Sequence, residues 1–304
     1  MKNSEKTVAS QGGTPRSAQG EARRSSRIAV LLVVVVGLLM QAGSALAVIV
    51  IDAVGVVEAL WLRTALAALL LAAARPRSLS LPPKGQRAVL VGLTLSLLAM
   101  NFSFYQAISR APVGIVVAVE FLGPLGVAIA GSRRGLDVLW ALLAGGGVAL
   151  LARPGGSVEV GGLLFALSAA GCWAAFIIFA KRSVTRMEPL KATTFMLVGA
   201  GILLTPVWLA TGVKIVGHGW ALLLGLAVAV LSSALPYLLE LAAIKRVRAS
   251  TYGVLVSIEP AIAALMGFLI LSQRLTYREM AGIVAVVIAA AGAARAAGQR
   301  HRVD

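Results

Sequence analysis

Ten apolar segments follow one another from residue 28 almost to the end of the chain, joined by short connections. An α-helix needs about 20 apolar residues to cross the hydrocarbon core of a bilayer. The chain is therefore predicted to be an all-α membrane protein with ten transmembrane helices. The predicted spans are 28–51, 55–74, 88–108, 111–130, 136–152, 159–180, 191–210, 219–240, 250–271 and 277–297.

Composition supports this class. Of the 304 residues, 59% are hydrophobic and only 13% are charged, whereas about 25% are charged in a typical soluble domain. The ten spans leave no room for a separate soluble domain. We expect the protein to act entirely within the bilayer.

The basic residues predict the orientation of the chain. On the ten-span map, 22 of the 28 lysines and arginines fall on one side, together with both chain ends. Lys and Arg accumulate in short cytoplasmic loops, so both termini are predicted to be cytoplasmic. The clusters lie between apolar runs rather than on one face, which argues against a nucleic-acid partner. Binding of these clusters to anionic membrane lipid is an alternative use.

The chain ends are polar. Residues 1–27 lack apolar periodicity and are predicted to form a disordered cytoplasmic tail, and residues 298–304 a second cytoplasmic tail. An alternative for the first span is a secretory leader, because arginines precede an apolar run that ends in Ala45-Leu-Ala47. Cleavage there would leave nine spans and break the symmetry described next.

The two halves of the chain share a local pattern. Gly114 and Glu120 recur at the same offset as Gly253 and Glu259, each glutamate inside an apolar segment. The sequence therefore predicts two five-helix repeats, 28–152 and 153–297. Because five crossings are an odd number, the second repeat must be inverted relative to the first. Inverted repeats place a substrate site near the midplane between the halves.

Glu120 and Glu259 are the first candidates for function. A carboxylate inside a span usually faces a cavity or a partner, and each glutamate lies near a proline, Pro124 or Pro260, that can open the helix locally. Such a site suits a proton or an ammonium group. The alternative is that each glutamate bonds a neighbouring helix and only fixes packing.

Arg63 is the only basic residue placed in the middle of a span. Its guanidinium keeps its charge at any relevant pH, so it needs a partner. One interpretation is a buried ion pair with Glu120 or Glu58. The other is a binding site for a substrate carboxylate, which the planar fork of donors also suits.

Two other spans carry unusual numbers of polar side chains. Asn101 and Tyr105 lie in the third span, and Tyr237 and Glu240 in the eighth. We take these four as candidate substrate-binding residues, although such side chains also join helices to one another. Further cavity candidates are Gln41, Ser44 and Trp173.

No enzyme constellation is visible. His218 and His301 fall in a loop and in the tail, and the single cysteine, Cys172, cannot form an intrachain disulfide. There is no Gly-x-Ser-x-Gly motif and no phosphate-binding loop. We therefore expect no catalysis, no metal and no cofactor, and any uphill transport would need an ion gradient or exchange.

Several motifs carry a resemblance to a known family. They are Asn101-Phe-Ser-Phe-Tyr-Gln-Ala-Ile, Pro112-Val-Gly-Ile-Val-Val-Ala-Val-Glu-Phe-Leu-Gly-Pro124, Ser132-Arg-Arg134, Leu231-Ser-Ser-Ala-Leu-Pro-Tyr-Leu-Leu-Glu240 and Ser257-Ile-Glu-Pro-Ala261. With the ten-span plan, they resemble the EamA family of the drug/metabolite transporter superfamily, from residue 28 to 295. The resemblance implies export of small neutral amino acids such as threonine and homoserine across the plasma (inner) membrane, coupled to inward proton movement.

In this hypothesis Arg63 holds the substrate carboxylate, while Glu120, helped by Glu259 or Glu240, alternates between proton and ammonium. One departure concerns the loop after the ninth span, where family members often have a Gly-Glu pair and this chain has Leu271-Ser-Gln273-Arg274. Two alternatives stay open: export of drugs or other metabolites, and a non-transporting membrane scaffold. The sequence does not indicate the oligomeric state.

Overall fold

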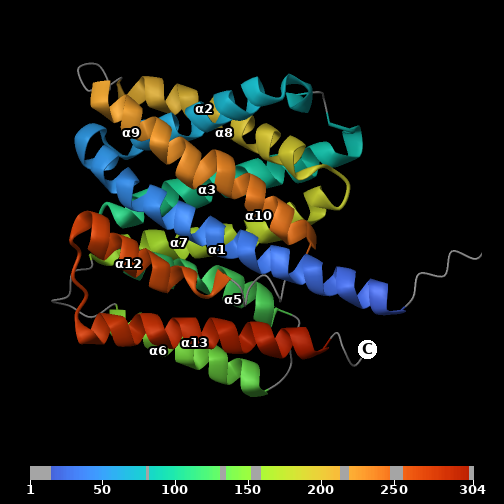
Figure 1. Ribbon diagram of the computed structural model, residues 1–304. Helices are drawn as coiled ribbons and strands as arrows, with labels where there is room; N and C mark the ends of the chain where they lie inside the picture. The colour runs from blue at the N-terminus through green and yellow to red at the C-terminus, as the bar shows by residue number, and fades with distance from the viewer. Residues whose placement is uncertain are drawn as a thin grey trace, which may run out of the picture.

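The computed structural model describes residues 15–79, 82–130, 135–151, 159–212, 219–246 and 256–300. Every regular element in these ranges is helical (Figure 1). The elements are α1 (Pro15–Val54), α2 (Val56–Ala74), η1 (Pro76–Leu79), η2 (Lys84–Gln86), α3 (Arg87–Ile108), α4 (Val113–Glu120), α5 (Leu122–Ile129), α6 (Gly135–Leu151), α7 (Val160–Val184), α8 (Pro189–Thr211), α9 (Gly219–Ala229), the π-helical η3 (Val230–Ala234), α10 (Leu235–Arg246), α12 (Glu259–Leu271) and α13 (Tyr277–Arg300). The all-α prediction is confirmed.

Six helices of the described chain are long and apolar enough to cross a membrane. They correspond to the first, second, third, sixth, seventh and eighth predicted spans. Three other apolar helices are shorter: Val113–Val127, Val138–Leu151 and Glu259–Leu271. In the fourth span, a turn at Phe121 separates α4 from α5, and the apolar stretch ends at Val127. The start of the ninth span, 250–255, lies outside the described residues, and the count of ten crossings stays a prediction.

The helices lie side by side in one bundle (Figure 1). α6 and α13 pack together along one edge and join the rest through α5 and α4. α2, α8 and α9 form the opposite edge, with α1, α3, α7 and α10 between them. The centre of the bundle is therefore built from segments distant in the sequence.

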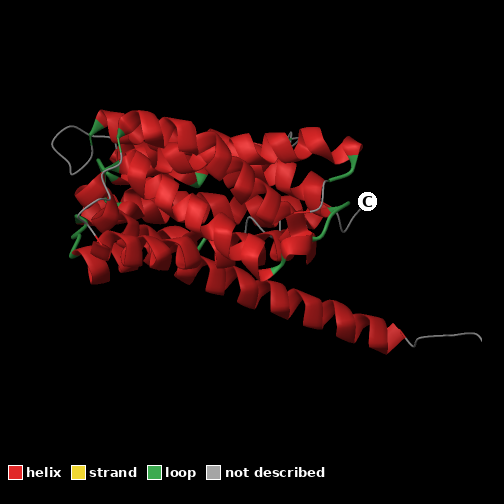
Figure 2. Cartoon of the chain, turned by 90° about the horizontal axis from the view of Figure 1, so that it is seen from above, coloured by secondary structure: helices red, strands yellow, loops and turns green. Residues whose placement is uncertain are grey.

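The first helix is longer than predicted. α1 begins at Pro15, so the stretch 15–27, which we predicted to be disordered, is helical. This stretch contains Ala, Gln, Glu and Arg, which favour helix, and it continues the apolar helix that follows. Its start extends beyond the bundle (Figure 2).

Apolar side chains cover the outside of the bundle and polar ones lie within it. Leu69, Leu142 and Leu223 are 65%, 68% and 72% exposed, whereas Arg63 and Glu120 are buried at 2% and 8%. A helix surface of this kind suits lipid, and buried ionisable groups in such a bundle face partners or a cavity.

Small residues allow the closest helix crossings. A Cβ added to Gly147 of α6 would lie 2.8 Å from the carbonyl oxygen of Gly282 in α13. A Cβ added to Gly43 of α1 would lie 2.7 Å from the Cβ of Ser232 in η3. Close approach through small residues is a common way for membrane helices to associate, and the second crossing brings η3 against α1.

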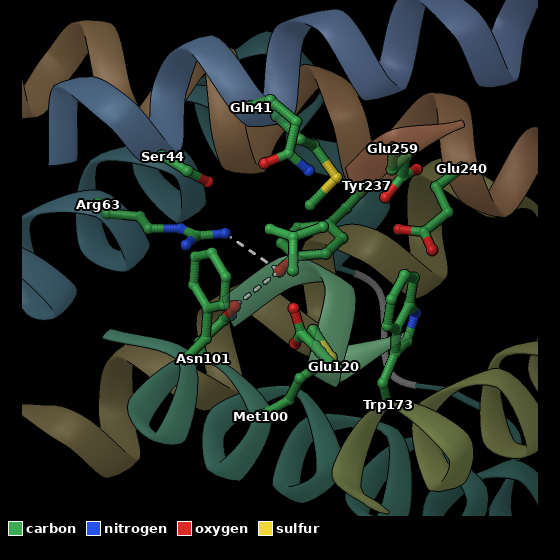
Figure 3. Close-up of a pocket in the computed structure, with 13 residues that line it drawn as sticks. Gln41, Ser44, Arg63, Met100, Asn101, Glu120, Trp173, Tyr237, Glu240 and Glu259 are labelled. Atoms are coloured by element: carbon green, nitrogen blue, oxygen red, sulfur yellow. Dashed lines mark hydrogen bonds between the residues drawn. The ribbon is translucent and has the colours of Figure 1, made fainter. Parts of the chain in front are cut away.

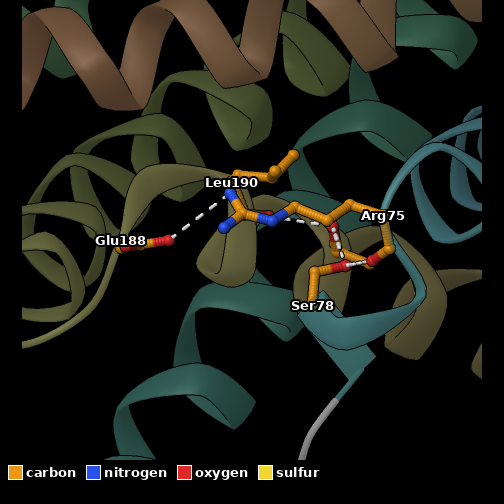
Figure 4. A network of polar contacts seen from close by, with 5 residues as sticks. Arg75, Ser78, Glu188 and Leu190 are labelled. Carbon is orange, nitrogen blue, oxygen red and sulfur yellow. Dashed lines mark hydrogen bonds and ion pairs between the residues drawn. The ribbon is translucent and has the colours of Figure 1, made fainter.

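A small polar network joins α2, η1 and α8 at one end of the bundle (Figure 4). Arg75 and Glu188 form an ion pair at 3.8 Å. The hydroxyl of Ser78 donates to the carbonyl oxygen of Arg75 at 2.7 Å and lies 3.2 Å from the hydroxyl of Thr194. The charged side chains are 59% and 71% exposed, so the pair contributes little to stability.

Candidate functional site

A small cavity lies between α1, α2, α3, α4, α7, α10 and α12 (Figure 3). The lining residues are Met40, Gln41, Ser44, Arg63, Met100, Asn101, Phe104, Val117, Glu120, Trp173, Tyr237, Glu240 and Glu259. Six of the seven predicted site residues are therefore brought together around one space.

The π-helical segment η3 contacts Arg63, one of the lining residues of this site. Pro236 has no N–H and so cannot donate to the carbonyl oxygen of Ser232, four residues earlier. The N–H of Leu235 instead bonds the carbonyl oxygen of Val230, one residue beyond α-helical spacing. Such π-bulges are frequent at functional sites, and this one makes the Ser232 carbonyl available to a side chain.

Arg63 uses that carbonyl. Its Nη2 donates to the Ser232 carbonyl oxygen at 2.7 Å, and its Nε donates to the hydroxyl of Ser233 at 2.6 Å. Nη2 also donates to the hydroxyl of Tyr237 at 3.1 Å. None of these bonds uses Nη1, so the guanidinium is fixed in orientation while the N–H groups of Nη1 remain available.

Two tyrosines and one asparagine complete the surroundings of Arg63. The Tyr237 hydroxyl donates to Oδ1 of Asn101 at 2.9 Å (Figure 3). The rings of Tyr105 and Tyr237 lie 5.2 and 5.8 Å from the guanidinium carbon, within cation–π range. Tyr105 is fully buried and does not line the cavity; it supports Arg63 from behind.

The two interpretations of Arg63 can now be compared. In the described part of the chain, Arg63 makes no ion pair with Glu120 or Glu58. Glu58 instead accepts a hydrogen bond at 2.7 Å from Nε1 of Trp208. Neutral hydrogen-bonding groups hold Arg63 in place, and its positive charge stays uncompensated by a direct carboxylate contact.

Glu120 and Glu259 each lie at an interruption of their helix. Glu120 is the last residue of α4, before the turn at Phe121, and Glu259 is the first residue of α12, followed by Pro260. The predicted opening of the helix is therefore present beside Glu120, whereas Glu259 begins α12 and residues 250–255 of its span lie outside the described chain. Neither side chain makes a hydrogen bond or ion pair with another described residue.

The cavity is unbalanced in charge. Among the described residues of its lining, Glu120, Glu240 and Glu259 supply three carboxyl groups, and Arg63 supplies one basic side chain. Carboxylates that share a cavity repel one another, which favours binding of a proton or another cation. The arrangement can bind a carboxylate at Arg63 and a positive group at the glutamates.

The sequence interpretation missed four lining residues: Met40, Met100, Phe104 and Val117. Each is adjacent to a polar candidate or lies at helical spacing from one, for example Val117 three residues before Glu120. That spacing places two residues on one helix face and could have identified them. Gln41, Ser44 and Trp173, named as further cavity candidates, also line the cavity.

Comparison of the sequence with known proteins identifies the family of this helical bundle. The model of the EamA-like transporter family matches residues 160–295. With relatives that cover most of the chain, this match shows that the protein belongs to that family. The resemblance noted from the motifs is confirmed.

The relatives carry one name. The chain is 38% identical over 257 residues to the threonine/homoserine exporter RhtA of Salmonella typhimurium, covering 83% of this chain and 86% of the relative. It is 37% identical over 269 residues to RhtA of Escherichia coli K12, covering 87% and 90%. A solved crystal structure at 20% identity covers 92% of this chain and 98% of its own with a TM-score of 0.64, a likeness of fold alone.

Proposed function

We propose that this protein exports small neutral amino acids, threonine and homoserine among them, in exchange for protons. The observation that carries the proposal is the fixed guanidinium of Arg63 in a cavity that also contains three carboxyl groups. An amino acid carries one negative and one positive group, so it matches both parts of this lining. The names of the two relatives support the choice of substrate.

Arg63 binds the substrate carboxylate. Its Nη1 can donate to a carboxylate oxygen, and the bonds from Nε and Nη2 to Ser232, Ser233 and Tyr237 hold the guanidinium without neutralising its charge. The orientation is set before substrate arrives, which lowers the cost of ordering the side chain on binding.

Glu120 binds either the substrate ammonium or a proton. Its carboxyl group lines the cavity and lacks a partner in the described chain. Because the Glu120 carboxyl group binds a proton or the substrate ammonium but not both, protons and substrate are exchanged across the membrane. Glu240 and Glu259 provide further positions for the proton. The cycle then needs no energy source besides the proton gradient.

We further propose that 28–152 and 153–297 are inverted five-helix repeats that cross the membrane ten times. In this plan α1 corresponds to α7, and α3 corresponds to α9, η3 and α10 together. Packing supports the symmetry, because α3 contacts α7 and, equivalently, α1 contacts α9, η3 and α10. Likewise α1 contacts α12 as α7 contacts α4 and α5. In this plan the protein lies in the inner membrane with both termini cytoplasmic.

Counterflow in proteoliposomes tests the proposal. The purified protein is reconstituted into liposomes loaded with unlabelled threonine or homoserine, and entry of the labelled amino acid is followed with and without a pH gradient. We expect gradient-dependent accumulation, and we expect Arg63→Ala to abolish it while the variant still elutes as folded protein.

Two outcomes would replace the proposal. Folded wild-type protein that moves no amino acid but moves drug-like compounds, with Arg63→Ala as active as wild type, would assign drug export. If changes of Arg63 or Glu120 singly prevented folding, and a double apolar replacement restored it, the charged groups would be structural and the protein a scaffold.

A further inference from the structure

We propose that Gln41 on α1 recognises a hydroxyl group in the substrate side chain, so that the cavity selects hydroxylated amino acids over apolar ones of the same shape. This inference rests on the proposed function and concerns the same cavity. It assigns a role in substrate selection to Gln41, which does not take part in the proposed binding of the substrate carboxylate and ammonium groups.

The amide of Gln41 is buried and unpaired. The residue is 4% exposed and lines the cavity, and its Oε1 has no hydrogen-bond partner. No hydrogen bond joins its side chain to any other residue that the structure describes. The conclusion therefore does not depend on which end of the amide is oxygen and which is nitrogen.

A buried amide without a partner is costly. The desolvation penalty of an unsatisfied polar group is of the same order as the gain from a hydrogen bond, and most buried polar groups in proteins are paired. If Gln41 only joined helices, its amide would bond a neighbouring helix, as Tyr237 bonds Asn101. Because the oxygen itself is shielded from solvent, a rotation of the Gln41 amide into the cavity that it lines would let an occupant supply the missing partner.

The position of Gln41 fits a substrate side chain. Gln41 and Ser44 extend from α1 on one side of the cavity, and Asn101 and Glu120 lie on the opposite side (Figure 3). A substrate side chain that points towards α1 meets the Gln41 amide and the Ser44 hydroxyl.

A hydroxyl group can hydrogen-bond to both the Gln41 amide and the Ser44 hydroxyl. It donates to the amide oxygen and accepts from a donor, whereas a methyl group in the same place displaces any water and leaves the amide unpaired. Sites built to bond a substrate hydroxyl reject the analogue without it more strongly than apolar pockets reject an extra hydroxyl. The cavity should therefore favour threonine over valine and homoserine over norvaline.

Competition during counterflow tests this inference. Unlabelled threonine, valine, homoserine and norvaline compete with labelled threonine in liposomes that contain wild type, Gln41→Leu or Gln41→Met. We expect wild type to prefer each hydroxylated compound by about tenfold or more, and both variants to lose that preference through weaker binding of the hydroxylated compounds. Gln41→Met preserves the side-chain length of glutamine and replaces Gln41→Leu in the experiment if that variant does not fold.

The control is Gln106→Leu, the same change on α3 at a residue outside the cavity lining, which should keep the wild-type ratio. Transport of amino acids with an unchanged ratio in both Gln41 variants would overturn the role of Gln41 and leave the proposed function standing. Absence of amino-acid transport by folded wild type would instead overturn the proposed function, and this inference with it.

Discussion

Nη2 of Arg63 donates a 2.7 Å hydrogen bond to the carbonyl oxygen of Ser232, the same oxygen to which Pro236 cannot donate. The two residues lie 169 positions apart in the chain. A proline in one helix thus creates the acceptor for an arginine in another, and a helix irregularity becomes part of a binding site.

Replacement of Pro236 with Ala tests this relationship. The new N–H would compete with Arg63 for the Ser232 carbonyl and favour regular α-helix through η3. A hydrogen bond to a charged group contributes about 1.5–3 kcal/mol, so we expect the KM for threonine in counterflow to rise by about tenfold or more. Pro206→Ala, which changes a proline in α8 away from the cavity, should keep the wild-type KM; an equal KM in both variants would contradict the mechanism.

Glu120→Gln should uncouple transport from the proton gradient. Glutamine cannot ionise, so it cannot alternate between proton and ammonium. We expect a pH gradient to add nothing to threonine accumulation by this variant, measured in the same liposomes as wild type. Glu188→Gln, at a 71% exposed carboxylate, should respond to the gradient normally, and a normal response by Glu120→Gln would remove that residue from the coupling mechanism.

Gly43→Ala should destabilise the protein, whereas Gly145→Ala should not. The added methyl group at Gly43 would lie 2.7 Å from the Cβ of Ser232, but at Gly145 it would meet nothing within 4 Å. Overpacking costs about 1–3 kcal/mol, while Gly→Ala in an open helical position gains about 0.5–1 kcal/mol. Thermal unfolding in detergent should give a lower Tm for Gly43→Ala only; equal Tm values would show that α1 can move away from η3.

The junction of α2 and α8 depends on Trp208. Its ring stacks on Trp61 with centroids 3.7 Å apart, and its Nε1 donates to Oε2 of Glu58 at 2.7 Å. Trp208→Phe keeps a stacked ring but leaves buried Glu58 without this donor, at a cost of about 1.5–3 kcal/mol. Trp208→Ala also loses stacking, about 0.5–1.5 kcal/mol more. Tm should fall in the order wild type, Phe, Ala, and a Phe variant as stable as wild type would show that the Glu58 bond is dispensable.

Local chemistry was readable in the sequence. Hydropathy identified a helical membrane protein because crossing a bilayer requires long apolar helices. The break beside Glu120 was predictable because proline affects backbone bonding within four residues of itself. The polar residues of the site were recognisable because such side chains are rare in apolar helices.

Only the tertiary structure decided how these residues meet. Of the partners expected for Arg63, neither Glu120 nor Glu58 forms an ion pair with it in the described chain, and Ser232, Ser233 and Tyr237 hold it from a distant part of the chain. Its pairing with a substrate carboxylate stays a proposal. Tyr237 lines the cavity while Tyr105 lies behind Arg63, a distinction that the sequence did not make. These helices are apolar on nearly every face, so no periodic pattern shows which side turns inward. That choice is made by the close packing of helices from both halves of the chain, which no single segment encodes.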